Sequence, residues 1–351
     1  MARLISPPPL RRGDRVAIVS LSSGMLGENP HSVTLGVERL RDLGLEPVFM
    51  PHALDGTAVL HDHPEYRAED LKTAFFDDSI RGIFTAIGGD DTYRLLPYLM
   101  EDAAFHDQVV KAPKVFSGFS DTTNNHLMFH RLGLQTYYGP CFLCDFAEAG
   151  KTMLPYTRAA VETYFGSSAP IRPSDTWYEE RTDFSAAAVG TERIAHRETH
   201  GFQLLQGPGV FEGELLGGCL ESLYDILTST RYTDQAELSR RYGIFPEREE
   251  WRGKIMFLET CEEKPAPELV RAELEAIAAT GAFREIRGLI VGKPQDEVFF
   301  EEYKEIYRQV IGDPALPILY NVNFGHAYPR TVLPYGASVR VDAAAQCITI
   351  L

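Results

Sequence analysis

The sequence predicts an α/β protein in which a doubly wound parallel sheet forms an N-terminal domain and a β-rich α/β domain follows. From residue 1 to about 165, short Val- and Ile-rich runs alternate with segments of helical periodicity, the pattern of a parallel sheet with helices on both faces. The pattern stops over residues 166–209, where polar residues dominate, and it resumes over residues 210–351. We therefore expect an N-terminal domain, a linker or mobile loop, and a C-terminal domain with these boundaries.

The N-terminal domain opens with residues 15–21, an apolar run between glycines that predicts a buried parallel strand. Residues 31–43 have apolar positions near helical spacing, and Gly44 then provides a natural C-cap. The same alternation continues along the domain. It predicts further strands at 47–50, 82–88 and 114–118, and further helices at 64–76, at 93–100 and from about residue 121.

The strand at 114–118 breaks at Gly118 and passes at once into a helix, so Ser120 lies at the carboxyl end of the strand. Ligands bind outside the carboxyl ends of such strands, and a serine on this turn exposes its hydroxyl beside helix-start N–H groups. Ser120 is therefore a candidate nucleophile. The alternative is that it caps the helix that begins near Asp121. The esterase motif G-x-S-x-G is not matched, because Thr122 replaces its second glycine.

The pair Gly88-Gly89 joins a predicted strand to the start of a helix, which makes a cradle of backbone N–H groups for an anion. Asp90 and Asp91 adjoin the pair and argue against a phosphate there. We expect either that one N–H binds a developing oxyanion or that the segment is a plain tight turn.

Two further groups of residues have the spacing of metal or redox sites. Cys141 and Cys144 lack a second pair for zinc, and five scattered cysteines suit a reducing compartment better than a disulfide framework. His61 and His63 have no third ligand in fixed register. We interpret the cysteines as structural and the histidines as part of a solvated loop, and we expect neither a metal nor a cofactor.

The composition indicates a globular chain that is long enough for two packed domains, with 351 residues of which 44% are hydrophobic. Its 50 acidic and 34 basic side chains give a net charge of −16, which opposes binding to a nucleic acid polymer. A small nucleotide can still bind, because a local pocket can differ in sign from the whole chain. No apolar run approaches the ~20 residues of a membrane span, and no apolar signal segment opens the chain. We expect a cytoplasmic protein without a membrane partner.

Trp177 lies in the polar segment 166–209, where it either packs as an anchor or stacks on a flat ligand. Glu259 ends an apolar run, where an acid is costly unless it is paired, or else it caps the next segment. His326 ends another predicted strand. The elements expected in this region are strands at 209–218, 254–260, 288–292 and 317–326, helices at 219–228, 267–280 and 299–311, and an antiparallel hairpin over 339–351.

Three predicted strand ends thus carry a serine, an acid and a histidine, in the order Ser120, Glu259, His326. This is the composition of a catalytic triad, whose geometry occurs in several chain orders on unrelated folds. Taken separately, each residue also has a structural explanation, and ten histidines offer other bases.

Taken together, the segments around these residues resemble the serine carboxypeptidase family of LD-carboxypeptidases and microcin C7 self-immunity proteins. The resemblance covers nearly the whole chain. Six motifs carry it in the right order: RGD at 12–14, GGDD at 88–91, GFSD at 118–121, GELLGG at 213–218, FLET at 257–260 and FGH at 324–326.

The resemblance implies a Ser-Glu-His hydrolase that works as a homodimer and has its site between the two domains. Matched residue by residue, Ser120 is the implied nucleophile, His326 the base and Glu259 the residue that orients it. The implied oxyanion hole consists of the N–H groups of Gly89 and Asp121.

The segment with Trp177 resembles the microcin-immunity branch, in which a tryptophan on this loop stacks on the nucleobase, whereas murein LD-carboxypeptidases are shorter here. Further substrate contacts are expected for four residues, Gly88, Gly218, Cys219 and Lys264. Cys219 stands where the family commonly has asparagine. If that amide contacts the carboxylate of an aspartyl substrate, Cys219 cannot replace it, because a thiol is a weak donor.

We therefore expect amide hydrolysis by acyl transfer, with Ser120 attacking the carbonyl and His326 moving the proton. The expected substrate is a peptidyl or aminoacyl nucleotide of the microcin C type, which is detoxified by cleavage of its amide-like bond. One alternative is removal of the terminal D-alanine from a murein tetrapeptide. Another is a two-domain protein that binds a ligand without chemistry.

Overall fold

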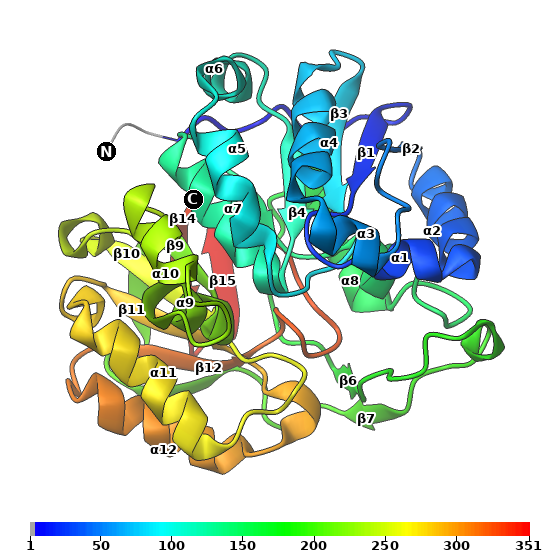
Figure 1. Cartoon of the computed structure of the whole chain (residues 1–351). Helices are drawn as coiled ribbons and strands as arrows, with labels where there is room; N and C mark the ends of the chain where they lie inside the picture. The colour runs from blue at the N-terminus through cyan, green and yellow to red at the C-terminus, as the bar shows by residue number, and fades with distance from the viewer. Residues whose placement is uncertain (1–3) are drawn as a thin grey trace. The chain divides into compact units, whose positions relative to one another are not determined.

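The structure, a computed structural model, describes residues 4–351 and consists of two compact units (Figure 1). The N-terminal unit contains residues 4–167 and the segment Arg181–Arg193. The C-terminal unit contains Ser168–Glu180 and Ile194–Leu351. The segment predicted as a linker or loop therefore contributes residues to both units.

Five parallel strands build the sheet of the N-terminal unit, in the order β5-β4-β3-β1-β2. They are β1 (Arg15–Val19), β2 (Glu46–Phe49), β3 (Ile80–Thr85), β4 (Val115–Gly118) and β5 (Tyr137–Tyr138). β1 lies between β3 and β2, so the strand order reverses there, as in a doubly wound sheet. Val16, Ala17, Ile18 and Val19 are all fully buried, the continuous pattern of a strand covered on both faces. The predicted fold of this domain is confirmed.

Helices follow these strands, and α4 contacts β1 and β3, in front of which it lies in Figure 1. The helices of the unit are α1 (Met25–Glu28), α2 (Pro30–Asp42), α3 (Thr57–Asp62), α4 (Pro64–Phe76), α5 (Leu96–Met100), α6 (Ala103–Lys111), α7 (Thr123–Arg131) and α8 (Pro155–Ala160). α2 and α4 each begin at a proline, which is tolerated in the first turn because its missing N–H has no intrahelical partner. The helix expected over 93–100 is divided into the 3₁₀ turn η1 (Thr92–Leu95) and α5.

The C-terminal unit contains a sheet of seven strands in the order β15-β14-β9-β10-β11-β12-β8. Its centre is parallel and consists of β9 (Val210–Cys219), β10 (Lys254–Glu259), β11 (Gly288–Gly292) and β12 (Ile318–Val322). Its edges are antiparallel and consist of β8 (Gln203–Gln206), β14 (Ser338–Asp342) and β15 (Cys347–Ile350). This confirms the predicted β-rich domain with its hairpin. The strand expected over 317–326 ends earlier, at Val322, so His326 lies in the loop beyond it.

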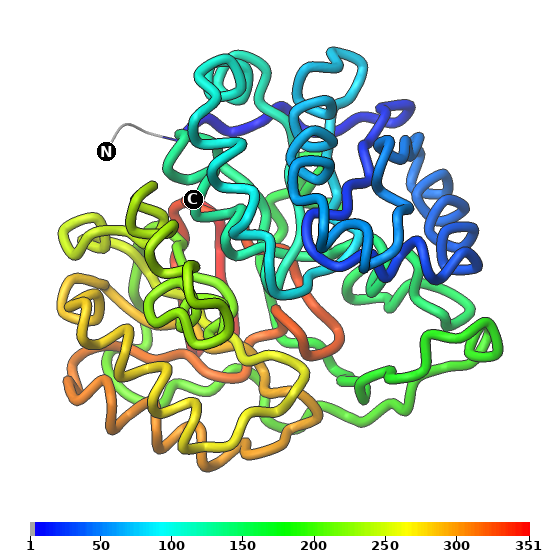
Figure 2. The backbone as a smooth tube through the Cα atoms, in the orientation of Figure 1, coloured from blue at the N-terminus to red at the C-terminus, as the bar shows by residue number. Residues whose placement is uncertain are grey.

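α11 (Pro267–Ala279) and α12 (Phe300–Ile311) pack side by side in this unit, as both views of the backbone show (Figures 1 and 2). α9 (Leu220–Thr228) contacts both α11 and α10 (Gln235–Arg241). Three short strands complete the unit: β6 (Thr176–Tyr178) and β7 (Ala195–Arg197), which pair with each other, and β13 (Leu333–Pro334).

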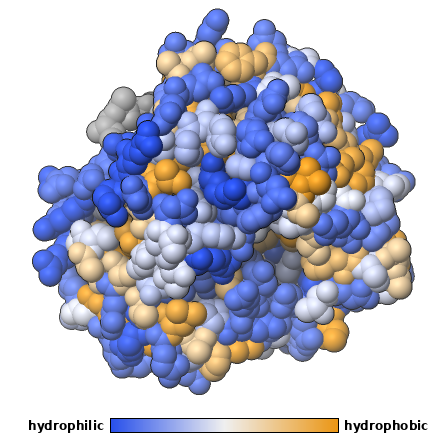
Figure 3. Space-filling model, in the orientation of Figure 1, coloured by the Kyte–Doolittle hydropathy of each residue, from blue (hydrophilic) through white to orange (hydrophobic). Residues whose placement is uncertain are grey.

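Hydrophilic side chains predominate on the face shown in Figure 3, and hydrophobic ones lie between them. Among the described residues, no helix is long and apolar enough to cross a membrane.

Candidate active site

Ser120 lies at the turn between β4 and the short helix η2 (Ser120–Thr122), with a φ of 64°. This left-handed conformation is uncommon for a residue with a side chain and often marks a functional site. Ser120 is not the helix cap that was the alternative interpretation, because the N-cap positions of η2 and α7 are Phe119 and Thr122. Its N–H donates to Tyr138 Oη at 3.1 Å, and its carbonyl accepts from Thr123 Oγ1 at 2.7 Å. The turn is thus fixed through the backbone of Ser120.

Gly88 and Gly89 bring the loop after β3 against this turn. A β-carbon on Gly88 would lie 2.7 Å from Ser120 Cβ and 2.8 Å from Ser120 Oγ, so only glycine permits the observed approach. Gly89 has a φ of 148°, and its β-carbon would lie 2.3 Å from Ser22 Oγ. The backbone nitrogen of Asp121 lies 3.5 Å from the β-carbon position of Gly88. The structure therefore gathers Ser120, the glycine pair and the Asp121 N–H.

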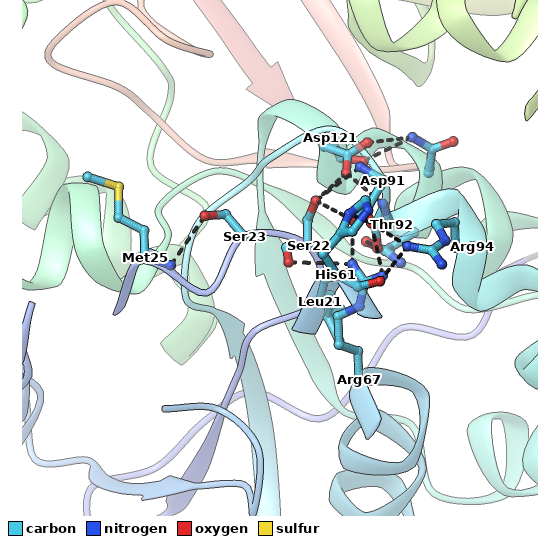
Figure 4. A network of polar contacts seen from close by, with 12 residues as sticks. Leu21, Ser22, Ser23, Met25, His61, Arg67, Asp91, Thr92, Arg94 and Asp121 are labelled. Atoms are coloured by element: carbon cyan, nitrogen blue, oxygen red, sulfur yellow. Dashed lines mark hydrogen bonds and ion pairs between the residues drawn. The ribbon is translucent and has the colours of Figure 1, made fainter. Parts of the chain in front are cut away.

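A buried polar network holds both turns in place (Figure 4). Asp121 Oδ2 accepts hydrogen bonds from Ser22 Oγ at 2.8 Å and from the Thr92 N–H at 2.9 Å. Asp91 forms an ion pair with Arg67, which is fully buried. Burial raises the pKa of Asp121 to about 6, although its hydrogen bonds with Thr92 and Ser22 oppose the rise. Asp91 therefore serves as an ion-pair partner and Asp121 as an internal hydrogen-bond acceptor.

The histidines and cysteines with metal-site spacing have separate partners. His61 Nδ1 lies 3.2 Å from Asp91 Oδ2, whereas His63 Nδ1 lies 2.8 Å from Glu65 Oε1. Cys141 and Cys144 are buried and form no disulfide; Cys141 directly precedes the irregular helical turn η3 (Phe142–Phe146), and Cys144 lies within it.

Glu259 and His326 form a buried pair in the C-terminal unit. His326 Nδ1 lies 2.8 Å from Glu259 Oε2, and the backbone N–H of His326 donates to the same oxygen at 3.1 Å. A β-carbon on Gly325 would lie 2.3 Å from Glu259 Cδ, so glycine is required for this approach. Because a carboxylate only accepts, Nδ1 must carry a hydrogen. Glu259 therefore has the partner that its burial required.

Glu262 contacts the other ring nitrogen of His326, with 3.1 Å between Glu262 Oε2 and His326 Nε2. Burial alone lowers the pKa of His326, but the charge and hydrogen bond of Glu259 and the hydrogen bond of Glu262 raise it to about 10. The hydrogen bond to His326 lowers the pKa of Glu262 to about 2, against the effect of burial. In this arrangement the imidazole is a doubly hydrogen-bonded cation. Sequence reasoning did not single out Glu262, although an acid so soon after Glu259 was a signal for it.

The remaining predicted residues lie in the C-terminal unit. Cys219 is buried and stands directly opposite Glu259 in the β9–β10 ladder, in which Gly218 is paired with Leu258. Lys264 Nζ lies 2.8 Å from Asp296 Oδ2 and 3.2 Å from Glu180 Oε2, so a substrate would have to compete with these carboxylates.

Trp177 is half-buried on β6 and stacks on His196 of β7, with ring centroids 4.2 Å apart and an interplanar angle of 18°. Lys293 Nζ lies 5.2 Å from the centroid of the same indole. The indole is thus already held by aromatic stacking and by a neighbouring cation.

The comparison with known proteins decides the family. Residues 16–139 match the LD-carboxypeptidase N-terminal domain, and residues 212–341 match the LD-carboxypeptidase C-terminal domain. The chain belongs to the LD-carboxypeptidase family. It is therefore a carboxypeptidase-type hydrolase, as its resemblance to the family implied.

Relatives of two kinds share the LD-carboxypeptidase architecture. A solved MccF-like protein from Streptococcus pneumoniae, in complex with AMP, is 53% identical over 96% of this chain and 98% of that chain, with a TM-score of 0.93. The "Probable murein peptide carboxypeptidase" of Bacillus subtilis is 26% identical over 98% of this chain and 93% of that protein. The microcin C7 self-immunity protein MccF of Escherichia coli is 23% identical over 95% of this chain and 92% of that protein.

Proposed function

We propose that this LD-carboxypeptidase-family protein is a Ser-Glu-His hydrolase that cleaves the amide-like bond of a peptidyl or aminoacyl nucleotide of the microcin C type. The product would be harmless to the cell, so the reaction confers self-immunity or detoxification. The proposal that the substrate contains a nucleotide rests on the 53% identity to an MccF-like protein whose structure was solved with AMP. The proposed Ser-Glu-His mechanism is supported by the buried contact between Glu259 and His326 and by the left-handed backbone conformation of Ser120.

In the proposed reaction, Ser120 Oγ attacks the carbonyl carbon while His326 Nε2 takes the hydroxyl proton. Glu259 holds the Nδ1–H and stabilises the imidazolium that forms. The N–H groups of Gly89 and Asp121 bind the tetrahedral oxyanion. The imidazolium then gives its proton to the leaving amine, and water attacks the acyl-enzyme to regenerate the serine. Removal of a single oxyanion donor typically costs ~10²–10³ in rate.

The setting proposed for this reaction is the cytoplasm, with the protein acting as a homodimer on a small-molecule substrate. None of the five cysteines, all of which lie in the described part of the chain, forms a disulfide, which suits a reducing compartment.

Glu262 must release His326 Nε2 before this nitrogen can act as a base, so we expect Glu262→Gln to increase hydrolysis near neutral pH. A base must be neutral, and the Glu262 carboxylate contributes to the raised pKa of His326. A raised pKa keeps the proton bound until the pH rises through it, so activity increases with pH along the acid limb. Loss of the carboxylate should move that limb to lower pH by about one unit. At a pH below the pKa of His326 in both proteins, kcat/KM of the variant should then be about tenfold higher than that of the wild type.

The measurement is kcat/KM as a function of pH for the wild type, for Glu262→Gln and for Glu263→Gln. Glu263 is an exposed neighbour in the same turn and provides the matched control. An acid limb that Glu262→Gln leaves in place would show that this carboxylate does not hold the proton on His326.

Trp177 should distinguish nucleotide from peptide substrates. If its indole stacks on the nucleobase, Trp177→Ala should raise KM for an aminoacyl sulfamoyl adenylate by the loss of about 1–3 kcal/mol, with little change in kcat. Trp177→Phe keeps an aromatic face and should lose less. A murein peptide has no flat base, so its KM should not change.

Tryptophan fluorescence gives a second readout of the same prediction, because Trp251, the other tryptophan, is fully buried. Binding of the adenylate should quench the wild type and leave Trp177→Ala unquenched. Persistent quenching in that variant, or equal changes for both substrates, would make Trp177 a packing residue.

The second candidate function is removal of the terminal D-alanine from murein tetrapeptides. It is favoured by the 26% identity to the "Probable murein peptide carboxypeptidase" of Bacillus subtilis over almost the whole of both chains. The same three residues would carry out that reaction, so the two functions differ in the substrate and not in the chemistry.

A further inference from the structure

Three different metal-binding groups converge at one buried site in the C-terminal unit: the Cys219 thiol, the Glu259 carboxylate and the His326 imidazole. One ligand atom from each lies within 4.8 Å of the other two. The three residues are only 2%, 1% and 7% exposed. Cys219 and Glu259 are register partners at the ends of β9 and β10, so the sheet itself fixes their spacing. The two hydrogen bonds to Glu259 fix the position of His326.

The types of donor select the kind of ion. A thiolate, an imidazole and a carboxylate are the ligands of Zn²⁺, whereas Mg²⁺ and Ca²⁺ prefer oxygen ligands alone. Zinc–ligand bonds of about 2.0–2.3 Å place the ligand atoms of one ion about 3.3–3.8 Å apart. Because the ligand atoms of this group lie within 4.8 Å of one another, no separation has to shorten by more than about 1 Å, which is within the reach of side-chain rotations.

Glu221 supplies a fourth donor atom, a second carboxylate oxygen, beside the thiol. Its Oε2 accepts a hydrogen bond from Cys219 Sγ at 3.1 Å, and its Oε1 accepts from the Cys261 N–H at 3.0 Å. Two carboxylates, Glu221 and Glu259, thus lie beside the thiol. A divalent cation would replace the positive charge that the His326 imidazolium now places beside Glu259.

We propose that Cys219, Glu259 and His326 bind Zn²⁺, with Glu221 as the fourth ligand, and that the bound ion inhibits the enzyme. The Cys219 thiol releases its proton to solvent as the sulfur–zinc bond forms, and His326 coordinates as a neutral imidazole after losing its second proton. The ion then engages the carboxylate and the imidazole that hydrolysis requires. The inhibitory part rests on the proposed function, whereas the binding part does not.

Cobalt is the spectroscopic probe for binding, because Co²⁺ occupies zinc sites and a thiolate ligand gives it a charge-transfer band in the near ultraviolet. We expect this band when the full-length, metal-free protein is titrated with Co²⁺, and we expect it to be absent in Cys219→Ser. Cys261→Ser is the matched control and should keep the band, because Cys261 is a nearby thiol that is not among the three residues whose ligand atoms converge. A wild type without the band, or a band that depends on Cys261 and not on Cys219, would overturn the site.

A second variant, which keeps every thiol, allows the site to be tested even if Cys219→Ser does not fold. Glu259→Gln should bind Co²⁺ more than about tenfold more weakly than the wild type. Unchanged affinity in Glu259→Gln would overturn the proposed ligand set, whatever the cysteine variants show.

Inhibition is measured separately, as the Zn²⁺ concentration that halves hydrolysis and the recovery after a chelator is added. Cys219→Ser should need at least about ten times more Zn²⁺ than the wild type, each relative to its own uninhibited rate. A cobalt band in a protein that hydrolyses neither substrate would refute the proposed function and leave the metal site standing. Hydrolysis that Zn²⁺ leaves unchanged would refute the inhibition and leave the function standing.

Discussion

Ser120→Ala is expected to abolish hydrolysis of an aminoacyl nucleotide while the protein remains folded. Loss of a triad nucleophile typically costs ~10⁶-fold in kcat, and the residual rate comes from the oxyanion hole and from substrate binding. The fold should tolerate the change, because the Ser120 side chain caps neither η2 nor α7 and the turn is held through its backbone. Alanine also retains the β-carbon, so the strain of the left-handed conformation is the same in both proteins.

The measurement for this variant is kcat and KM, together with the thermal unfolding midpoint. Ser79→Ala, at an exposed serine of the same unit whose hydroxyl contacts Asp77 and Arg15, provides the control for the loss of a serine hydroxyl outside the candidate site. A Ser120→Ala protein that keeps more than about a tenth of wild-type turnover would reject Ser120 as the nucleophile.

His326→Ala should also remove nearly all activity, by ~10⁶-fold, and Glu259→Gln should cost less, by ~10⁴-fold. The difference arises because, in the proposed mechanism, His326 transfers the proton, whereas Glu259 only fixes the orientation of the ring and its tautomer. Glutamine fits the same space but can present an N–H toward Nδ1 instead of an acceptor, so the ring loses its fixed orientation. The buried 2.8 Å contact between the two side chains makes this effect large.

These two variants are compared in one assay at saturating substrate, with Glu263→Gln as the exposed control. Circular dichroism confirms that each protein is folded. Equal residual rates for His326→Ala and Glu259→Gln would contradict the roles that we assign to the two residues.

Most of the regular elements could be predicted because their signals are local. α2 and α4 start at prolines, and buried strands such as β1 and β10 are continuous apolar runs. The same reasoning failed for α10, whose buried positions include Gln235 and Ser239 and therefore show no apolar periodicity. β8 was hidden in the polar segment for a similar reason, because it is an edge strand with half-exposed residues.

The candidate residues could be predicted singly, but their contacts could not. That Cys219 stands opposite Glu259 depends on the register of β9 against β10, which two separate strand patterns do not specify. Arg330 was missed because arginine is normally exposed. In the structure it is fully buried, donates to the His326 carbonyl at 3.1 Å and lies over the Tyr328 ring.

Product analysis by mass spectrometry tests the proposed reaction most directly. The purified protein and Ser120→Ala are each incubated with an aminoacyl sulfamoyl adenylate and with a murein tetrapeptide, side by side. We expect the wild type to release the free amino acid and the sulfamoyl nucleoside, the variant to release neither, and the tetrapeptide to remain intact. Release of D-alanine from the tetrapeptide with an intact adenylate would contradict the nucleotide substrate, and equal product from Ser120→Ala would contradict the serine mechanism.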